Sequence, residues 1–317
     1  MTKNESSTST QIQSCDNVNL FRSRPPRYRV PVPRRMRELE IVSSKLIRAG
    51  FAGEYHSAFH GRGIEFSQVR EYQPGDDVRT IDWNVTARSG TPHVKEFVEE
   101  RDLTVIVAVD VSGSMSFGSI DWRKCDLATE LAALFAYSAV QNADRVGLLI
   151  FSDSVRKYIA PRRGHAHAQI VVRAAIAATR ECTGQADLEG ASRFLDRVNR
   201  RRSVIILLSD FLDTHFRTTL RRLGSRHDVI AIRVSDPRET RPAAAALAHI
   251  VDAETGAARL VDLRKGGTPQ PARPSKTTGD PVVRELGRSG VELLEVSTAA
   301  PYERDLLRFF GRRGVRR

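Results

Sequence analysis

One stretch near the middle of the chain, TVIVAVDVSGSMS from Thr104 to Ser116, limits most strongly the folds that this sequence can adopt. Its first six residues are all apolar or β-branched, which is typical of a strand buried on both faces of a sheet. The apolar run ends abruptly at Asp110, and Ser112 and Ser114 follow at alternate positions around Gly113. We therefore expect a central parallel strand that ends in a polar turn.

The polar turn has two chemical interpretations. One carboxylate and two hydroxyls are hard oxygen donors, which suit a small cation such as Mg²⁺. Ligands of open α/β sheets also bind at the carboxyl ends of the strands. Alternatively, Ser112 or Ser114 caps the helix that follows, as serine often does. The pentapeptide alone does not favour either interpretation.

Helix and strand patterns alternate along the rest of the chain. Helical spacing of apolar residues occurs in 123–141, 168–178, 187–198 and 214–223, and short apolar runs occur at 146–151, 204–208, 229–234 and 291–296. Residues 236–279, rich in Pro, Ala and Gly, are expected to hold short edge strands and loops. The alternation predicts an α/β fold, a Rossmann-like doubly wound, mostly parallel sheet with helices on both faces.

The segment before the central strand has a different character. A helix is predicted over Arg35–Ala49, with Gly50 as its stop. Short β-rich pieces follow at Ile64–Tyr72, Val78–Trp83 and His93–Glu99, and they predict a small β-rich subdomain. Arginines alternate with carboxylates in these pieces, so we interpret the charges as ion pairs and not as acid–base catalysts.

These patterns divide the chain into four parts. Residues 1–33 are polar and Pro/Arg-rich and are predicted to be a disordered basic arm. Residues 34–101 hold the helix and the small β-rich subdomain, and residues 102–300 form the α/β domain. Residues 301–317 are expected to form a C-terminal helix and an Arg-rich tail, since five of the last ten residues are arginine.

Composition narrows the class of protein further. The net charge of +12 allows an acidic partner surface or a nucleic acid, but the arginine runs lack the interleaved aromatic residues of a nucleic-acid interface. Three scattered cysteines exclude a disulfide framework and favour a reducing cytoplasm. The sequence shows no signal peptide and no apolar run near the roughly 20 residues that span a bilayer.

A second predicted strand strengthens the cation interpretation of the polar turn. The run SVIILLSD also ends in a carboxylate, Asp210. If the two strands are neighbours, parallel pairing brings Asp110 and Asp210 to the same edge of the sheet. Two carboxylates and two hydroxyls at one edge favour cation binding over simple helix capping.

Taken together, these motifs resemble a von Willebrand factor type A domain with its metal-ion-dependent adhesion site. DVSGS at Asp110–Ser114 matches the Asp-x-Ser-x-Ser loop of that site, and Asp210 in LLSDF matches its third-loop aspartate. The segments at 61–90, 94–105, 144–153 and 226–239 are similar, in the same order, to the bacterial domain of unknown function 58 family. The resemblance covers roughly residues 35–312.

The resemblance implies a metal site and also shows one departure from it. It implies a Mg²⁺ ion, or Mn²⁺ or Ca²⁺, held by Asp110, Ser112, Ser114 and Asp210. The second-loop Thr of such sites stands directly before Asp-Leu, where this chain has Ala186, which has no side-chain oxygen. Either Thr183, three residues earlier, replaces it after a rearrangement of the loop, or a water does.

The same resemblance implies a function. It implies a cytoplasmic partner of MoxR-type AAA+ ATPases that acts in chaperone-like maturation or assembly of client proteins. We therefore expect a non-catalytic, divalent-metal-dependent protein-interaction module without catalytic residues. The alternatives are a metal-dependent phosphohydrolase-like enzyme, which would want a second Asp at the place of Ser112, and a basic nucleic-acid-binding protein.

Overall fold

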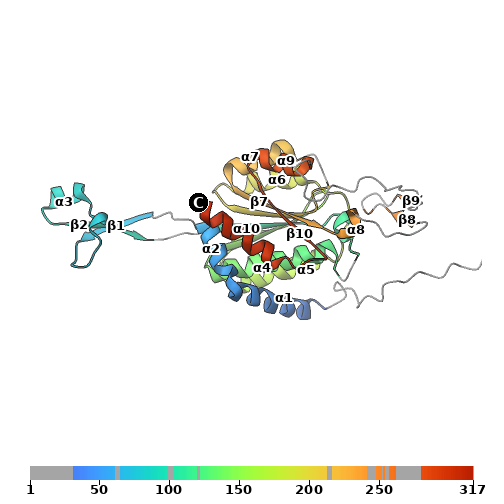
Figure 1. The fold of residues 1–317 in the computed structure, drawn as a ribbon, viewed down its shortest axis with the longest axis horizontal. Coiled ribbons are helices and arrows are strands. Elements are labelled where there is room, and N and C mark those ends of the chain that lie inside the picture. The colour runs from blue at the N-terminus through green and yellow to red at the C-terminus, as the bar shows by residue number, and fades with distance from the viewer. Residues whose placement is uncertain are drawn as a thin grey trace, which may run out of the picture.

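A six-stranded sheet forms the centre of the computed structural model (Figure 1). The structure describes residues 31–60, 65–98, 103–119, 122–212, 216–240, 248–251, 253, 257–261 and 280–316. The strand order is β10-β7-β6-β3-β4-β5, formed by Glu292–Ser297, Asp228–Ser235, Val204–Ser209, Thr104–Asp110, Arg145–Phe151 and Val155–Arg162. All neighbours run parallel except β4 and β5. The predicted α/β fold with a mostly parallel sheet is confirmed.

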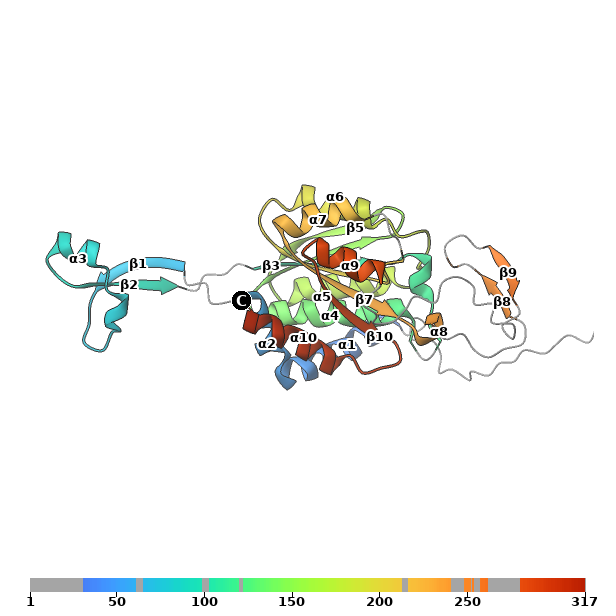
Figure 2. The ribbon, with the colours of Figure 1, turned by 45° about the horizontal axis from the view of Figure 1, so that its top comes forward.

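Helices cover both faces of this sheet (Figures 1 and 2). One face packs against α1 (Val32–Leu46), α2 (Ala52–His60), α4 (Lys124–Gln141), α5 (His165–Ala178) and α10 (Glu303–Arg316). The other face packs against α6 (Leu188–Val198), α7 (Arg217–Arg226) and α9 (Pro281–Arg288). The short α8 (Pro237–Thr240) follows β7. The arrangement is the doubly wound one that alternating strands and helices predict.

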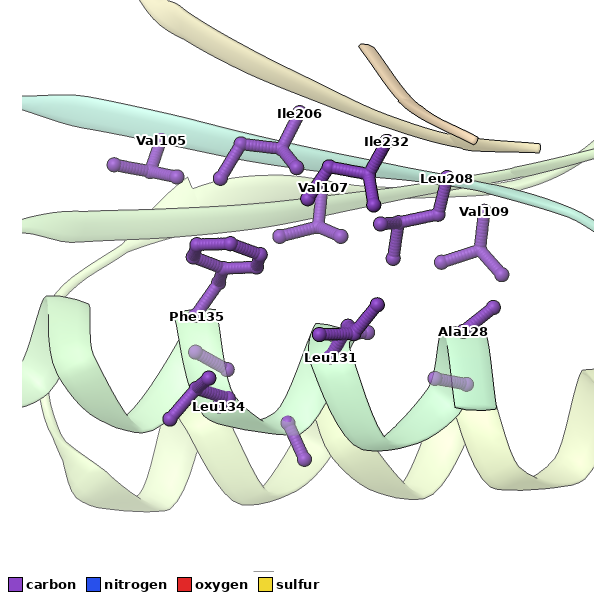
Figure 3. Packing of buried hydrophobic residues seen from close by; sticks show 14 of the residues in the cluster. Val105, Val107, Val109, Ala128, Leu131, Leu134, Phe135, Ile206, Leu208 and Ile232 are labelled. Atoms are coloured by element: carbon purple, nitrogen blue, oxygen red, sulfur yellow. The ribbon is translucent and has the colours of Figure 1, made fainter. Parts of the chain in front are cut away.

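The two faces of β3 show why its sequence is apolar throughout. Val105, Val107 and Val109 belong to the core shared with α4, whereas Ile106 and Ala108 belong to the core on the opposite face. In Figure 3 the three valines lie over α4, opposite side chains such as Leu131 and Phe135. Because successive residues of a strand point to opposite faces, a strand covered on both sides has no place for a polar residue.

The outer helices are joined by a cluster of aromatic rings. Phe310 of α10 lies 5.4 Å, between ring centroids, from Phe51 and from Phe59, and 5.8 Å from Phe135 of α4. Gly50, at φ 117°, breaks the helical path between α1 and α2 and positions Phe51 for this contact. The helix predicted over Arg35–Ala49 starts earlier, at Val32, within the segment expected to be a disordered arm. After the kink at Gly50 the chain continues as a second helix, α2.

The upstream strands form a separate antiparallel pair, β1 (Glu65–Glu71) and β2 (His93–Val98). The prediction of a β-rich piece over Val78–Trp83 is wrong. This stretch is a short 3₁₀ turn, η3 (Val78–Thr80), followed by the start of α3 (Trp83–Ser89). Asp82 accepts hydrogen bonds from the amides of Asn84 (2.9 Å) and Val85, and so starts α3. This capping outweighs the β-propensity of the stretch.

The charges of the upstream segment form ion pairs, as its alternation of signs predicted. Arg70 binds Asp76 through two nitrogens, at 2.7 and 2.8 Å. Hydrogen bonds from Arg70 and from the Gln73 amide lower the pKa of Asp76 to about 2. A carboxyl group with such a pKa stays ionised at neutral pH and is a poor general acid.

The last part of the chain is partly described. Within 236–279, β8 (Ala248–Val251) and β9 (Ala258–Val261) form a short antiparallel pair. The disordered arm predicted for residues 1–33 lies outside the described residues except for its last three positions. Among the helices that the structure describes, none combines the length and the apolar character needed to cross a membrane.

A buried histidine at the end of α7 predicts acid sensitivity. His227 is 3% exposed, and neither of its ring nitrogens has a hydrogen-bond partner. Burial, together with the charge of Arg226, lowers the pKa of His227 below 6.5. Below that pH the unfolded chain binds a proton that the folded chain resists, so the free energy of unfolding decreases as the pH falls.

We therefore expect His227→Phe to reduce the loss of stability between about pH 7 and pH 5, where an ordinary histidine titrates. Chemical unfolding monitored by circular dichroism at several pH values measures this change. His165→Phe is the matched control because the His165 side chain is exposed at the start of α5. If the free energy of unfolding changed with pH equally in wild type and His227→Phe, burial of His227 would not be a cause of the acid sensitivity.

Candidate metal site

The carboxyl ends of two neighbouring strands bring Asp110 and Asp210 together. Asp110 is the last residue of β3, and Asp210 follows the last residue of β6. The two strands pair in parallel, with Val109 opposite Leu208. Both carboxylates are therefore at the same edge of the sheet, and both are buried.

The Asp110 carboxylate is held on both oxygens. Oδ1 accepts a hydrogen bond from the Ser112 amide at 2.8 Å, and Oδ2 accepts one from the Ser209 hydroxyl at 2.6 Å. Burial and the nearby charge of Asp210 nevertheless raise the pKa of Asp110 to about 7. Two acidic groups in one buried place favour either a proton or a cation between them.

Ser112 and Ser114 present their hydroxyls to each other, with the two Oγ atoms 3.1 Å apart. Both serines are buried beside Asp110. Ser112 precedes the short 3₁₀ helix η4 (Gly113–Ser116) but makes no side-chain cap to it. The next long helix, α4, begins only at Lys124, and there the Asp126 carboxylate accepts a hydrogen bond from the Arg123 amide at 3.2 Å. The capping interpretation of these serines is therefore wrong.

The second loop reaches this edge through its backbone. The Thr183 amide donates to the carbonyl of Val111 at 3.0 Å, and the carbonyl of Gly184 accepts from the Gly113 amide at 2.8 Å. The Thr183 hydroxyl itself is exposed and accepts a hydrogen bond from Arg156 at 2.8 Å. The structure thus gathers Asp110, Ser112, Ser114 and Asp210, whereas the Thr183 hydroxyl is engaged by Arg156.

A buried lysine beside Asp210 was not predicted from the sequence. The ammonium group of Lys124, at the first residue of α4, lies 2.7 Å from Oδ2 of Asp210 and also pairs with Glu239 of α8. Burial lowers the pKa of Lys124, but the charges of Asp210 and Glu239 outweigh it and leave the pKa raised. Lys124 is therefore charged at neutral pH. Nothing in its local sequence separates it from an exposed lysine.

The backbone after Asp210 is strained. Phe211 has a φ of 53°, in the left-handed region that non-glycine residues seldom adopt. Its ring is buried and packs edge-to-face on Phe216 at 6.0 Å. Its amide donates to the Ser209 hydroxyl, which in turn binds Asp110. The strained turn fixes Asp210 close to Asp110, which is typical of a functional position.

The residues present fit a small hard cation. Ionised carboxylates offer about four acceptor sites each, so the hydrogen bonds already made leave lone pairs for an ion. Within the described residues there is no group of three or more His, Cys, Asp or Glu suited to hold a metal. An ion at this edge would therefore depend on the hydroxyls of Ser112 and Ser114, with water completing its shell, as Mg²⁺ commonly does.

Fold and site together define an α/β protein with an Asp-x-Ser-x-Ser loop and a second aspartate at the carboxyl edge of its sheet. The chain belongs to the family described as "Protein of unknown function DUF58", whose model matches residues 68–269. Relatives include "Uncharacterized protein Rv1480" of Mycobacterium tuberculosis and "Uncharacterized protein Mb1516" of Mycobacterium bovis. Each is 31% identical over 280 residues, covering 88% of both chains.

Solved structures with partial similarity include the hypothetical protein BatB from Bacteroides thetaiotaomicron, at a TM-score of 0.44 and 13% identity. This match covers 67% of the present chain and 99% of the other. The SpRpn10 VWA domain matches at a TM-score of 0.34 and 12% identity, over 65% of this chain and 94% of that one.

Proposed function

We propose that this chain is a non-catalytic protein-interaction module whose binding surface is completed by a divalent cation, Mg²⁺ in the first instance. The observation that carries the proposal is the buried pair of Asp110 and Asp210 beside the hydroxyls of Ser112 and Ser114. A carboxylate pair that shares one buried place is stabilised by a positive charge between its members. The cation would present its remaining coordination position to an acidic side chain of a partner.

The chemistry of the edge supports binding more than catalysis. Both oxygens of Asp110 accept hydrogen bonds, and Asp210 is paired with Lys124, which makes both carboxylates weaker nucleophiles. The Ser112 hydroxyl lies 3.1 Å from that of Ser114 and also hydrogen-bonds the Asp110 carboxylate, which favours the ionised form of that carboxylate. The oxygens of Asp110, Asp210, Ser112 and Ser114 form a set of potential ligands for an ion.

The partner in this proposal is a MoxR-type AAA+ ATPase, with which the chain would act in chaperone-like maturation or assembly of client proteins in the cytoplasm. Family membership supports this choice, through the resemblance of the motifs. The charge of +12 favours an acidic partner surface, and arginines such as Arg193 and Arg222 are exposed on α6 and α7.

Capture of a purified MoxR-type ATPase by the immobilised chain tests the proposal. We expect Mg²⁺ to support capture, and Asp110→Ala to reduce it by about tenfold or more, since one charged ligand contributes at least 1.4 kcal/mol. Asp305→Ala, which removes an exposed carboxylate of α10, is the matched control. Because Mg²⁺ also acts on the ATPase, the deciding comparison is wild type against Asp110→Ala at constant Mg²⁺.

Two results would refute this function. One is capture that is equal for wild type and Asp110→Ala in the presence of Mg²⁺. The other is capture by wild type that does not change when Mg²⁺ is replaced by a chelator in the absence of nucleotide. Circular dichroism of each variant shows whether a loss of capture reflects unfolding.

A further inference from the structure

Two features of the surroundings of Lys124 disfavour a positive charge on its side chain. Its side chain is fully buried, so its ammonium group has lost its hydration. It is also the first residue of α4, where the helix dipole favours negative groups. Only strong local compensation can keep a charged lysine at such a position.

Two carboxylates provide that compensation. The Lys124 ammonium lies 2.7 Å from Oδ2 of Asp210, and Oε1 of Glu239 pairs with the same nitrogen. Glu239 is fixed by its other oxygen, which accepts the Asp236 amide at 2.9 Å. Asp236 in turn accepts from the Ser119 amide at 2.9 Å and from the Thr298 hydroxyl at 2.7 Å.

The position of this ammonium bears directly on metal binding. Asp210 is one of the two carboxylates at the candidate metal site, and Lys124 already occupies one of its oxygens. A divalent ion that coordinates Asp210 would lie within a few ångströms of a unit positive charge in a buried place, where the repulsion is large. Glu239, at 29% side-chain exposure, is the more accessible of the two partners of Lys124.

We propose that Lys124 is an internal cation that competes with the divalent ion for Asp210, so that metal binding requires the ammonium to move away from Asp210 toward Glu239. This inference rests on the proposed metal site and adds a residue that controls the affinity of that site. The competition makes the affinity of the wild-type site lower than its oxygen donors alone would give. Glu239 then remains the ion-pair partner of the Lys124 ammonium.

Direct titration with Mn²⁺, followed by calorimetry or by its electron paramagnetic resonance signal, tests the competition without any partner protein. We expect Lys124→Met to bind Mn²⁺ about tenfold or more tightly than wild type, because the repelling charge is gone. Lys157→Met is the matched control, since it removes the same charge from an exposed position in β5. Its affinity should equal that of wild type.

Lys124→Met leaves Asp210 and Glu239 without their shared cation and can be unstable. The double variant Lys124→Met with Glu239→Gln removes one charge of each sign and leaves Asp210 as the one charged group of the three. It should also bind Mn²⁺ more tightly than wild type. In the wild-type protein, the ¹⁵N resonance of the Lys124 ammonium should shift when Mg²⁺ is added.

The outcomes separate this inference from the proposed function. Affinities for Mn²⁺ that agree within about twofold among wild type and both variants would overturn the competition, as would a Lys124 resonance that Mg²⁺ leaves unchanged. Tighter Mn²⁺ binding by the variants supports it whether or not an ATPase is captured. Conversely, loss of metal-dependent capture with the titration result intact would refute only the partner function.

Discussion

Replacing Phe310 with alanine should lower the free energy of unfolding by about 3–5 kcal/mol. The ring is fully buried in α10 and contacts rings from three other helical segments, those of Phe51, Phe59 and Phe135. Truncation removes its apolar surface from the core and leaves a cavity between rigid helices that cannot close around it. Chemical unfolding monitored by circular dichroism measures the loss.

Val315→Ala is the matched control for Phe310→Ala, because Val315 is in the same helix and is 89% exposed. Its effect should stay within about 0.5 kcal/mol, as for most surface substitutions. If Phe310→Ala changed stability as little as Val315→Ala does, α10 would not be packed against α2 and α4 as described. The prediction therefore tests the docking of the C-terminal helix as well as the value of one ring.

The second large effect is expected from Arg313, which is buried at the end of α10. Its guanidinium pairs with Asp228 of β7 and with Glu292 of β10. Arg313→Met should lower the free energy of unfolding by about 3–5 kcal/mol, because it removes a buried guanidinium that pairs with Asp228, whose side chain is only 10% exposed. Thermal and chemical unfolding of the purified variant both report this loss.

Arg312→Met provides the control, because Arg312 is the preceding residue, is exposed and bonds only to the Arg308 carbonyl of its own helix among the contacts described. It should change stability little. Adding Asp228→Asn to Arg313→Met should recover part of the loss, since the carboxylate that has lost its ion pair with Arg313 is then replaced by a neutral amide. No recovery in the double variant would show that the cost comes from packing of the arginine and not from loss of its ion pair with Asp228.

Several features were predictable from local sequence because they depend on local chemistry. The apolar run of β3 must be buried on both faces, and Asp110 and Asp210 must end strands of the same sheet. Strand β5 escaped prediction because it is a sheet edge whose side chains are exposed or only partly buried, so VRKYIAPR lacks the apolar run of a central strand. The β-propensity of Val78–Trp83 predicts a strand, but side-chain caps from Asp77 and Asp82 make this stretch a turn and the start of a helix.

The amino-acid sequence by itself determined the class of the fold and placed Asp110 and Asp210 at the ends of apolar strands, because burial patterns follow from residue order. The pairing of β3 with β6, which brings the two carboxylates to one edge, was decided by the tertiary structure. Only the tertiary structure decided which side chains face those carboxylates. It placed Lys124 against Asp210 and turned the Thr183 hydroxyl to Arg156. Such contacts join residues far apart in the chain, and their energies depend on burial and distance, which no local pattern encodes.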